Sequence, residues 1–397
     1  MKTTQTGTAF AILSLLAVSH MFNDMLQSII SAVYPLLKDS LLLNFTQIGL
    51  ITLVFQLSSS LFQPVVGLIT DKKPQPYSLP IGMTFTMIGI LSLSLAGSFT
   101  QVLIAVFLTG LGSSVFHPEA SRLAYMASGG KHGLAQSLFQ VGGNLGSSVG
   151  PLLALWIITP YGQRNIGWLS LIALISIGIM MVISKWYKAN LYRLKPVPKT
   201  DDNTETKQVS KYSSKKIAFA ISILLILIFS KYVYMASLSS YYMFYLIDKF
   251  NISVYDAQLF LFAFLFAVAA GTIAGGPIGD RIGRKYVIWA SILGTAPFAL
   301  IMPHVSLVWT CILSIFIGLI LSSAFSAILV YAQELVPGKV GLIGGLFFGL
   351  AFGVAGIASA VLGRIADNTS IQHVYDICSY LPLIGLVAAF LPNTKKI

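Results

Sequence analysis

The sequence predicts an all-α membrane protein with twelve transmembrane helices, and three observations support this fold class. Of the 397 residues, 56% are apolar and only 10% are charged, whereas about 25% of the residues of a soluble protein are charged. Twelve apolar runs each approach or exceed the roughly 20 residues that cross a bilayer. Lysine and arginine gather in alternate connections between these runs. This composition excludes a soluble enzyme, a fibrous protein and a disordered chain.

The twelve apolar runs give the order of the predicted helices. Lipid offers no hydrogen-bond partner to the backbone, so these runs must be helices rather than open strands. Most of them are longer than one membrane thickness, which predicts tilted or kinked helices. The predicted spans cover residues 10–36, 46–70, 78–97, 101–127, 132–158, 165–186, 217–247, 255–280, 286–303, 306–335, 340–365 and 372–391.

The distribution of basic residues predicts the orientation. Nineteen of the 25 lysines and arginines lie in even-numbered loops or at the termini, and four lie beside odd-numbered loops. Because cytoplasmic loops carry the excess of basic residues, we expect both termini in the cytoplasm and the protein in a bacterial inner membrane. The net charge of +12 therefore reports topology, and no nucleic-acid partner is expected. Cys311 and Cys378 lie inside apolar runs and form neither a disulfide framework nor a metal-binding spacing.

A polar stretch divides the chain into two halves. Residues 188–216 are rich in lysine and contain prolines without apolar periodicity, which indicates a cytoplasmic linker. Its position predicts one six-helix bundle over residues 1–187 and a second over residues 217–397.

Span one carries polar residues on one face. His20, Asn23 or Asp24, and Gln27 follow one another at helical spacing, so this face must be directed inward. A charge at membrane depth is costly and marks a functional group. We therefore interpret Asp24 as a proton-coupling residue and His20, Asn23 and Gln27 as substrate-binding residues. The alternative is a structural cluster of hydrogen bonds that holds helices together.

Span four contains His117-Pro118-Glu119, followed by Arg122. Pro118 is expected to kink the helix, and Glu119 and Arg122 are three residues apart, which allows an ion pair. Either this pair is a permanent structural salt bridge, or Glu119 exchanges its pairing with Arg122 for a proton and is a second coupling residue. His117 and Arg122 are candidate substrate-binding residues, and His117 is also a possible proton relay.

Span five has a polar face and a glycine ridge. Gln136, Gln140 and Asn144 recur every four residues, and we interpret Gln140 and Asn144 as lining the substrate site. Glycines at the same spacing in spans five and eleven allow close helix packing. A G-x-S-x-G sequence centred on Ser148 matches a hydrolase motif. The strand and turn that this motif requires are not predicted here, so an intramembrane hydrolase remains only a rival hypothesis.

Span seven places Lys231 near the middle of the membrane. We expect its partner to be an intramembrane carboxylate or an anionic substrate. Tyr234 and Tyr241 are candidate lining residues, although packing or interface positions are the alternative. Within the predicted spans, the negative charges of Asp24 and Glu119 balance the positive charges of Arg122 and Lys231. Binding of an anionic substrate therefore requires either a freed cation or a bound proton.

Two loops repeat at corresponding positions of the halves. Residues 276–285 read G-P-I-G-D-R-I-G-R-K, which resembles the signature loop of the major facilitator superfamily. Residues 67–73 form a degenerate copy in which Pro74 stands where the later Gly-Arg-Lys would begin, and residues 146–151 resemble the core of an antiporter motif. The resemblance covers the whole chain. It implies two pseudo-symmetric six-helix bundles with a central cavity between them.

The same resemblance implies a gate at the cytoplasmic side. Asp71 is expected to meet the start of span eleven and Asp280 the start of span five, where a carboxylate faces the positive end of the helix dipole. Gly283 belongs to the same loop, and Arg281 and Arg284 would add ion pairs. The alternative is that these basic residues only anchor the loop at the cytoplasmic face.

Longer stretches resemble a narrower family, the bacterial drug exporters that confer fosmidomycin resistance. The matching stretches are SHMFNDMLQSIISAVYPLL in span one, SSVFHPEASRLAYMASGGKHGLAQSLFQVGGNLGSSVGPLL across spans four and five, and ILIFSKYVYMASLSSYYMFYL in span seven. This resemblance implies a monomeric, non-enzymatic drug/proton antiporter that exports fosmidomycin or a similar small anionic drug. Its partners would be the drug, protons and lipid, with no metal and no cofactor. The alternatives are a proton-linked importer of a small organic anion and a channel.

Overall fold

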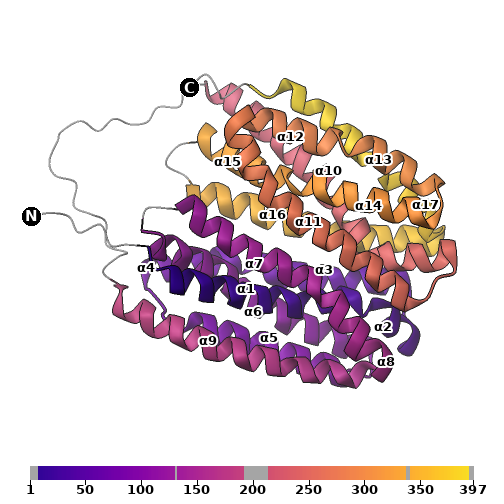
Figure 1. The fold of residues 1–397 in the computed structure, drawn as a ribbon, viewed down its shortest axis with the longest axis horizontal. Coiled ribbons are helices and arrows are strands. Elements are labelled where there is room, and N and C mark those ends of the chain that lie inside the picture. The colour runs from indigo at the N-terminus through magenta and orange to yellow at the C-terminus, as the bar shows by residue number, and fades with distance from the viewer. Residues whose placement is uncertain (1–7, 130–131, 192–212, 337–339, 393–397) are drawn as a thin grey trace, which may run out of the picture.

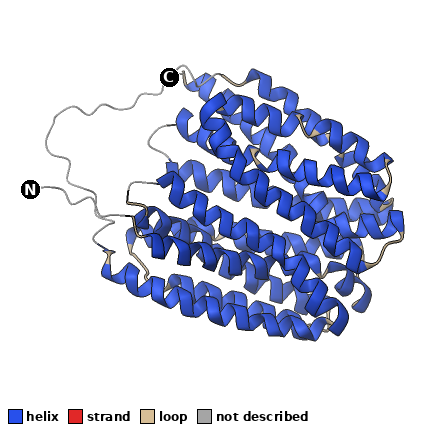
Figure 2. Cartoon of the chain, in the orientation of Figure 1, coloured by secondary structure: helices blue, strands red, loops and turns tan. Residues whose placement is uncertain are grey.

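The computed structural model describes residues 8–129, 132–191, 213–336 and 340–392. Within these ranges the chain is formed of helices and connecting loops, as Figure 2 shows. Twelve helical segments of the described chain are long and apolar enough to cross a membrane. The prediction of an all-α membrane protein with twelve spans is therefore confirmed.

The first half breaks some of its spans where the sequence places proline. Span two is interrupted at Phe62, just before Pro64, because proline cannot continue the backbone hydrogen-bond ladder. Span five passes into a π-helical turn shortly after Pro151. Span four continues as one helix through Pro118. The elements are α1 (Phe10–Ala32), α2 (Tyr34–Ser40), α3 (Phe45–Leu61), α4 (Gln63–Lys72), α5 (Ser78–Leu95), α6 (Phe99–Ala127), α7 (His132–Leu153), η1 (Ala154–Ile158), α8 (Thr159–Tyr161), η2 (Gln163–Leu169) and α9 (Ser170–Ala189).

The second half has the longest helix and the signature loop. Gly283 has a φ angle of +104° between two helices, a conformation that side chains with a Cβ rarely adopt. This explains the glycine of the signature at that position. The elements are α10 (Ser214–Phe250), α11 (Val254–Ile282), α12 (Arg284–Leu293), α13 (Ala296–Ile301), η4 (Met302–His304), α14 (Leu307–Ser322), α15 (Ala324–Leu335), α16 (Val340–Asn368), α17 (Ile371–Cys378) and η5 (Leu381–Phe390).

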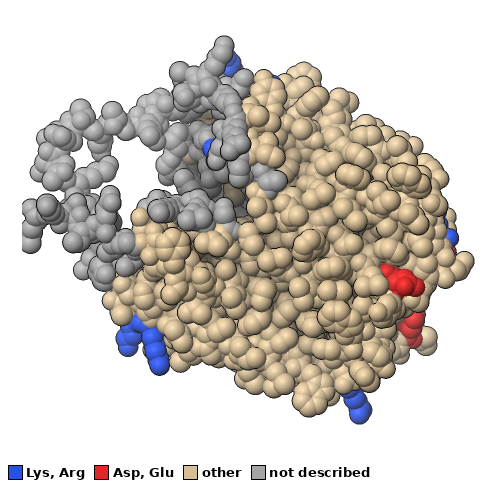
Figure 3. Space-filling view, viewed as in Figure 1, with Lys and Arg blue, Asp and Glu red and all other residues tan. Residues whose placement is uncertain are grey.

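The two halves lie side by side (Figure 1), the first in indigo to magenta and the second in orange to yellow. They meet chiefly where α3 packs on α16 and α7 on α11. On the face shown in Figure 3, nearly all of the described surface is neither acidic nor basic, as a surface in contact with lipid requires. Residues 192–212, most of the predicted linker, lie outside the described residues, so the proposed domain boundaries stay a prediction.

The glycine ridge of α7 packs as expected. A Cβ at Gly142 would lie 2.1 Å from the carbonyl oxygen of Ala17, and one at Gly146 would lie 2.0 Å from that of Met21. Both oxygens belong to α1, so α1 and α7 approach so closely that these positions leave no room for a side chain.

The corresponding expectation for α16 is wrong at two positions. A Cβ at Gly349 or Gly353 would meet no described atom within 4 Å, and the same holds for Gly67 on α4. Farther along α16, however, a Cβ at Gly363 would lie 2.2 Å from the carbonyl oxygen of Phe45. Between these positions, a Cβ at Gly356 would lie 3.0 Å from the Cβ of Gln56, so α3 and α16 are in contact from Phe45 to Gln56. We call the end where α1 begins the terminal end and the opposite one the far end.

Hydrogen bonds between the halves close the far end. The carboxylate of Asp367, near the end of α16, accepts from the backbone amides of Phe45 (2.8 Å) and Thr46 (2.7 Å) and from the Thr46 hydroxyl (2.6 Å). It therefore caps the N-terminus of α3 from the other half of the molecule. Nearby, the hydroxyl of Tyr241 on α10 donates across the halves to the carbonyl oxygen of Phe45 at 3.4 Å. The halves are thus joined by hydrogen bonds at the far end, whereas no described atom lies within 4 Å of a Cβ at Gly349 or Gly353.

Candidate functional site

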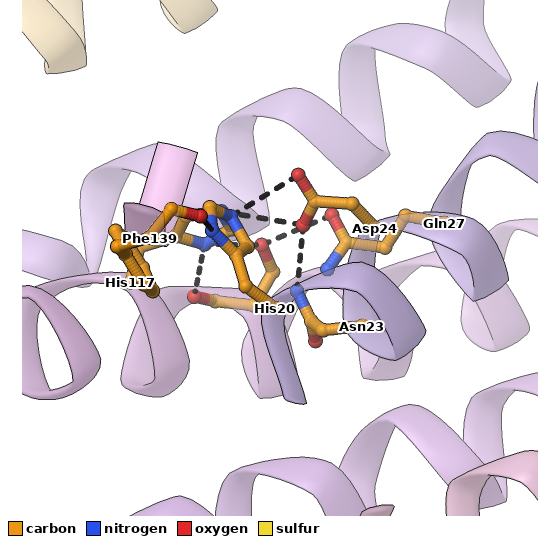
Figure 4. A network of polar contacts seen from close by, with 7 residues as sticks. His20, Asn23, Asp24, Gln27, His117 and Phe139 are labelled. Atoms are coloured by element: carbon orange, nitrogen blue, oxygen red, sulfur yellow. Dashed lines mark hydrogen bonds and ion pairs between the residues drawn. The ribbon is translucent and has the colours of Figure 1, made fainter. Parts of the chain in front are cut away.

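Two histidines and an aspartate meet inside the first half (Figure 4). Nε2 of His20 lies 3.2 Å from Oδ2 of Asp24 on α1, and Nε2 of His117 on α6 lies 3.5 Å from Oδ1 of the same carboxylate. We call these three side chains the His–Asp–His cluster. The sequence suggested each residue separately, and the packing of α1 against α6 brings them together.

The outer nitrogen of each imidazole faces a backbone carbonyl. Nδ1 of His20 lies 2.7 Å from the carbonyl oxygen of Phe139 on α7, and Nδ1 of His117 lies 3.0 Å from that of Ser113. A carbonyl oxygen only accepts hydrogen bonds, so both Nδ1 atoms must carry the hydrogen. When the rings are neutral, each Nε2 therefore presents a lone pair to the Asp24 carboxylate. Three acceptors then converge, and a positive charge, such as a proton, is needed between them.

Neighbouring amides and a hydroxyl hold the cluster in place. Nδ2 of Asn23 donates to Oδ1 of Asp24 at 3.0 Å. The hydroxyl of Ser113 accepts from Nδ1 of His117 at 3.2 Å. The same hydroxyl donates to Oε1 of Gln27 at 3.2 Å. Asn23 and Gln27, predicted as substrate-binding residues, are thus within the network that orients the cluster.

Three contributors were missed by the sequence interpretation. Phe139 supplies a carbonyl oxygen and a ring stacked on His20, with centroids 3.9 Å apart. A Cβ at Gly143 would lie 2.4 Å from Nε2 of His20 and 2.7 Å from Oδ2 of Asp24, so the absence of a side chain leaves room for the cluster. Ser113 precedes His117 by one helical turn, and this spacing is the one signal that could have been read from the sequence.

The cluster is buried but open on one side. The side chain of His20 is 3% exposed, whereas Asp24 is 18% and His117 is 22% exposed. Asp24 and His117 therefore keep some accessible surface, whereas His20 has almost none.

Glu119 and Arg122 form the predicted ion pair. Oε1 of Glu119 lies 3.6 Å from Nη1 of Arg122, and the Glu119 side chain is completely buried. Nη2 of Arg122 also donates to the hydroxyl of Tyr187 on α9, and the Ser78 hydroxyl on α5 donates to Oε2 of Glu119 at 3.5 Å. The pair is confirmed as a contact that joins α5, α6 and α9. Its role in proton coupling stays a prediction.

Lys231 is buried in the second half without an acidic partner among the described residues. The residue is 4% exposed, and its Nζ donates to the carbonyl oxygen of Ser322, the last residue of α14, at 3.4 Å. The rings of Tyr232 and Phe325 lie with their centroids 5.5 and 5.6 Å from Nζ. Of the two expected partners, a carboxylate is not seen here. Instead the ammonium faces the negative end of a helix dipole.

The other predicted site residues are scattered. Gln140 and Asn144 are half-buried on α7, whereas Tyr234 and Tyr241 are fully buried on α10. Substrate contact by these four stays a prediction, and Tyr241 joins the halves at the far end in this structure.

The gate residues are described only in part. The side chains of Asp71, Asp280 and Arg281 lie outside what the structure describes, as does that of Gln136. Arg284, the first residue of α12, is half-buried. The predicted gating contacts therefore stay predictions.

The buried serine of the hydrolase-like sequence has no catalytic setting. Ser148 lies inside α7 and its hydroxyl donates to the carbonyl oxygen of Leu145, one turn earlier, at 2.7 Å. The strand-turn-helix geometry of a nucleophile elbow is absent from this described helix.

Comparisons with known proteins agree with the fold. The Major Facilitator Superfamily profile matches residues 16–357 and 223–396. The fosmidomycin resistance protein of Escherichia coli (strain K12) is 61% identical over 394 residues, which cover 99% of this chain and 96% of that protein. An uncharacterized MFS-type transporter of Bacillus subtilis (strain 168), YfnC, is 42% identical over 98% of this chain and 95% of its own length.

A solved structure supports the fold independently. The inward-facing and occupied conformation of a bacterial homologue of the human lysosomal transporter Spinster superposes with a TM-score of 0.70 at 14% identity, over 96% of this chain and 94% of that one. The likeness concerns the fold alone. The family match and the relative at 61% identity show a multi-pass membrane transporter rather than an enzyme. The chain belongs to the major facilitator superfamily.

Proposed function

We propose that this protein is a proton-coupled efflux transporter that exports fosmidomycin or a similar small anionic drug in exchange for protons and so confers antibiotic resistance. The observation that carries the proposal is the 61% identity, over nearly the whole chain, to a protein named for fosmidomycin resistance. The distribution of basic residues supports a bacterial inner membrane with both termini in the cytoplasm. The monomer is the functional unit.

Lys231 supports an anionic substrate. Its ammonium is buried against a carbonyl oxygen and two aromatic rings, none of which carries a full negative charge. A phosphonate or carboxylate would offer it a charge-assisted hydrogen bond, which is about twice as strong as a neutral one. Arg122 is the second candidate cation, and it becomes available when Glu119 is protonated.

Asp24 and Glu119 are the proposed coupling residues. A proton in the His–Asp–His cluster relieves the convergence of acceptors around Asp24, and a proton on Glu119 releases Arg122. Both steps change the balance of charge inside the first half. Protons and drug then bias the inward- and outward-open states through their different affinities for each.

The closed far end supports alternating access. Under the predicted orientation the terminal end is cytoplasmic, and the lack of described contacts at Gly349 and Gly353 supports a state that is open toward the cytoplasm. The bonds that Asp367 and Tyr241 make with Phe45 and Thr46 across the halves would break when the far end opens. The predicted gate at Asp71 and Asp280 would close the terminal end in that state.

Drug uptake into proteoliposomes under an imposed pH gradient tests this function. Vesicles loaded at acidic pH and diluted into alkaline medium should accumulate labelled fosmidomycin as protons leave, and a protonophore should abolish the accumulation. Protein-free vesicles are the control. Uptake that is equal with and without the gradient would contradict proton coupling, and no saturable uptake at all would contradict the substrate.

A further inference from the structure

The His–Asp–His cluster has the dimensions of a transition-metal site. In a tetrahedral zinc site with bonds of about 2.0–2.2 Å, neighbouring donor atoms lie about 3.3–3.6 Å apart. The Asp24 carboxylate oxygens lie 3.2 and 3.5 Å from the Nε2 atoms of His20 and His117. One donor atom from each residue falls within a set whose members all lie within 4.8 Å of one another. Small movements would therefore complete a three-ligand site.

The surroundings orient the donor lone pairs as in known metal sites. A histidine that binds a metal almost always donates its other ring N–H to a backbone carbonyl, a carboxylate or water. Both imidazoles do so here, His20 to Phe139 and His117 to Ser113, and both Nε2 atoms are thereby directed at Asp24. Asn23 in turn holds the carboxylate. These partners fix the tautomers before any ion arrives, which lowers the cost of binding one.

The donor set selects the kind of ion. Two imidazoles and one carboxylate suit Zn²⁺, Co²⁺, Ni²⁺ or Cu²⁺, whereas Mg²⁺ and Ca²⁺ prefer oxygen ligands alone. The partial exposure of Asp24 and His117 leaves one side open for a fourth ligand and for entry. At the back, Gly143 provides space that a methyl group would fill.

We infer that His20, Asp24 and His117 form a binding site for Zn²⁺ with one open coordination position. The ion would be an external ligand rather than a resident cofactor, and when it is absent the cluster is available to protons. Bound Zn²⁺ joins α1 to α6 and occupies the carboxylate on which transport depends, so it blocks the transport cycle. The binding rests on the geometry alone, whereas the block rests on the proposed function.

Co²⁺ binding to the purified protein tests the site directly. The full chain, prepared in detergent without a polyhistidine tag, is titrated with Co²⁺, whose visible spectrum reports tetrahedral coordination, and Zn²⁺ is then added as a competitor. We expect one Co²⁺ per chain, displaced by Zn²⁺. A spectrum without tetrahedral features, or Co²⁺ that Zn²⁺ fails to displace, would overturn the proposal.

Variants assign the ligands. His20→Gln and His117→Gln should each weaken binding by more than the roughly 10–100-fold that loss of an outer partner costs. His304→Gln and His373→Gln, at exposed positions on η4 and α17, are the matched controls and should bind as the wild type does. Binding that survives in the first pair, or is lost in the second, would show that the ion lies elsewhere.

Gly143→Ala tests the site without replacing a ligand, in case the ligand variants fail to fold. It keeps all three ligands but places a methyl group 2.4 Å from Nε2 of His20, so it should abolish Co²⁺ binding. A thermal unfolding curve shows which variants are folded, and full binding by folded Gly143→Ala would contradict the site. In proteoliposomes, Zn²⁺ should inhibit drug transport. Co²⁺ binding without this inhibition would leave the site intact and refute the proposed role of the cluster in transport.

Discussion

The two halves of the molecule bury their charges in different ways. In the first half, each buried carboxylate has basic neighbours, Asp24 between His20 and His117, and Glu119 beside Arg122. In the second, the described residues around the ammonium of Lys231 offer a carbonyl oxygen and aromatic rings. Because a charge at membrane depth is costly, the first half has balanced its charges internally and the second has left one cation for an outside partner. The difference is the basis on which we propose proton chemistry in the first half and anion binding in the second.

Asp24→Asn should have the largest effect. The amide keeps the size of the side chain but cannot take up or release a proton, so pH-driven drug uptake should fall to the level of protein-free vesicles. Asp39→Asn, on the exposed part of α2, is the matched control and should transport normally. Proton-driven uptake that persists in Asp24→Asn would remove the cluster from the coupling mechanism and break the assignment of the two halves.

Glu119→Gln separates coupling from structure. It leaves Arg122 without its ion-pair partner, and breaking a buried pair costs about 3–5 kcal/mol, so both transport and the unfolding midpoint should fall. The double variant Glu119→Gln/Arg122→Gln removes both charges and should recover part of the stability but none of the transport. Recovery of proton-driven transport in the double variant would show that the pair is only structural.

Lys231→Gln tests the second half. A hydrogen bond to a charged group contributes about 1.5–3 kcal/mol, which corresponds to about 10–150-fold in affinity. We expect the affinity for anionic fosmidomycin to fall by roughly this factor, and that for a neutral ester of the drug to change little, both measured by isothermal titration calorimetry. Equal losses for the two compounds would mean that Lys231 only stabilises the end of α14.

Alanine substitutions in the glycine ridges should have the smallest effect, a change in the unfolding midpoint. They test how tightly the helices of each half pack. Gly146→Ala brings a methyl group 2.0 Å from a backbone oxygen of α1, and overpacking of this kind costs about 1–3 kcal/mol. Gly349→Ala meets no described atom in this structure. The unfolding midpoint in detergent should therefore fall for the first and stay level for the second. A large fall for Gly349→Ala would show that the terminal end is closed in solution.

The spans were predictable because the thickness of the lipid dictates them. The predicted span at 78–97, for example, became Ser78–Leu95, and the break before Pro64 follows from the missing amide hydrogen of proline. The expectation about α16 failed because glycine spacing shows that helices can approach, whereas the conformational state decides whether they do. Gly349 is open here and Gly363, on the same helix, is not.

The candidate site was predictable in its residues but not in its geometry. Intramembrane polarity singled out His20, Asp24 and His117, since each costs free energy in lipid. Nothing in the sequence said that α1 and α6 bring them within hydrogen-bond range. The carbonyl oxygen of Phe139 fixes the tautomer of His20. Every residue has a backbone carbonyl, so this contribution cannot be recognised from the residue type.

The most direct test of the central claim measures protons that move in response to drug. Proteoliposomes containing a pH-sensitive dye are mixed with fosmidomycin at equal pH on both sides, so that the drug gradient alone drives the cycle. The account predicts that the vesicle interior becomes alkaline as drug enters and protons leave, and that Asp24→Asn/Glu119→Gln abolishes this signal. Drug entry by the wild type with an unchanged internal pH would contradict it.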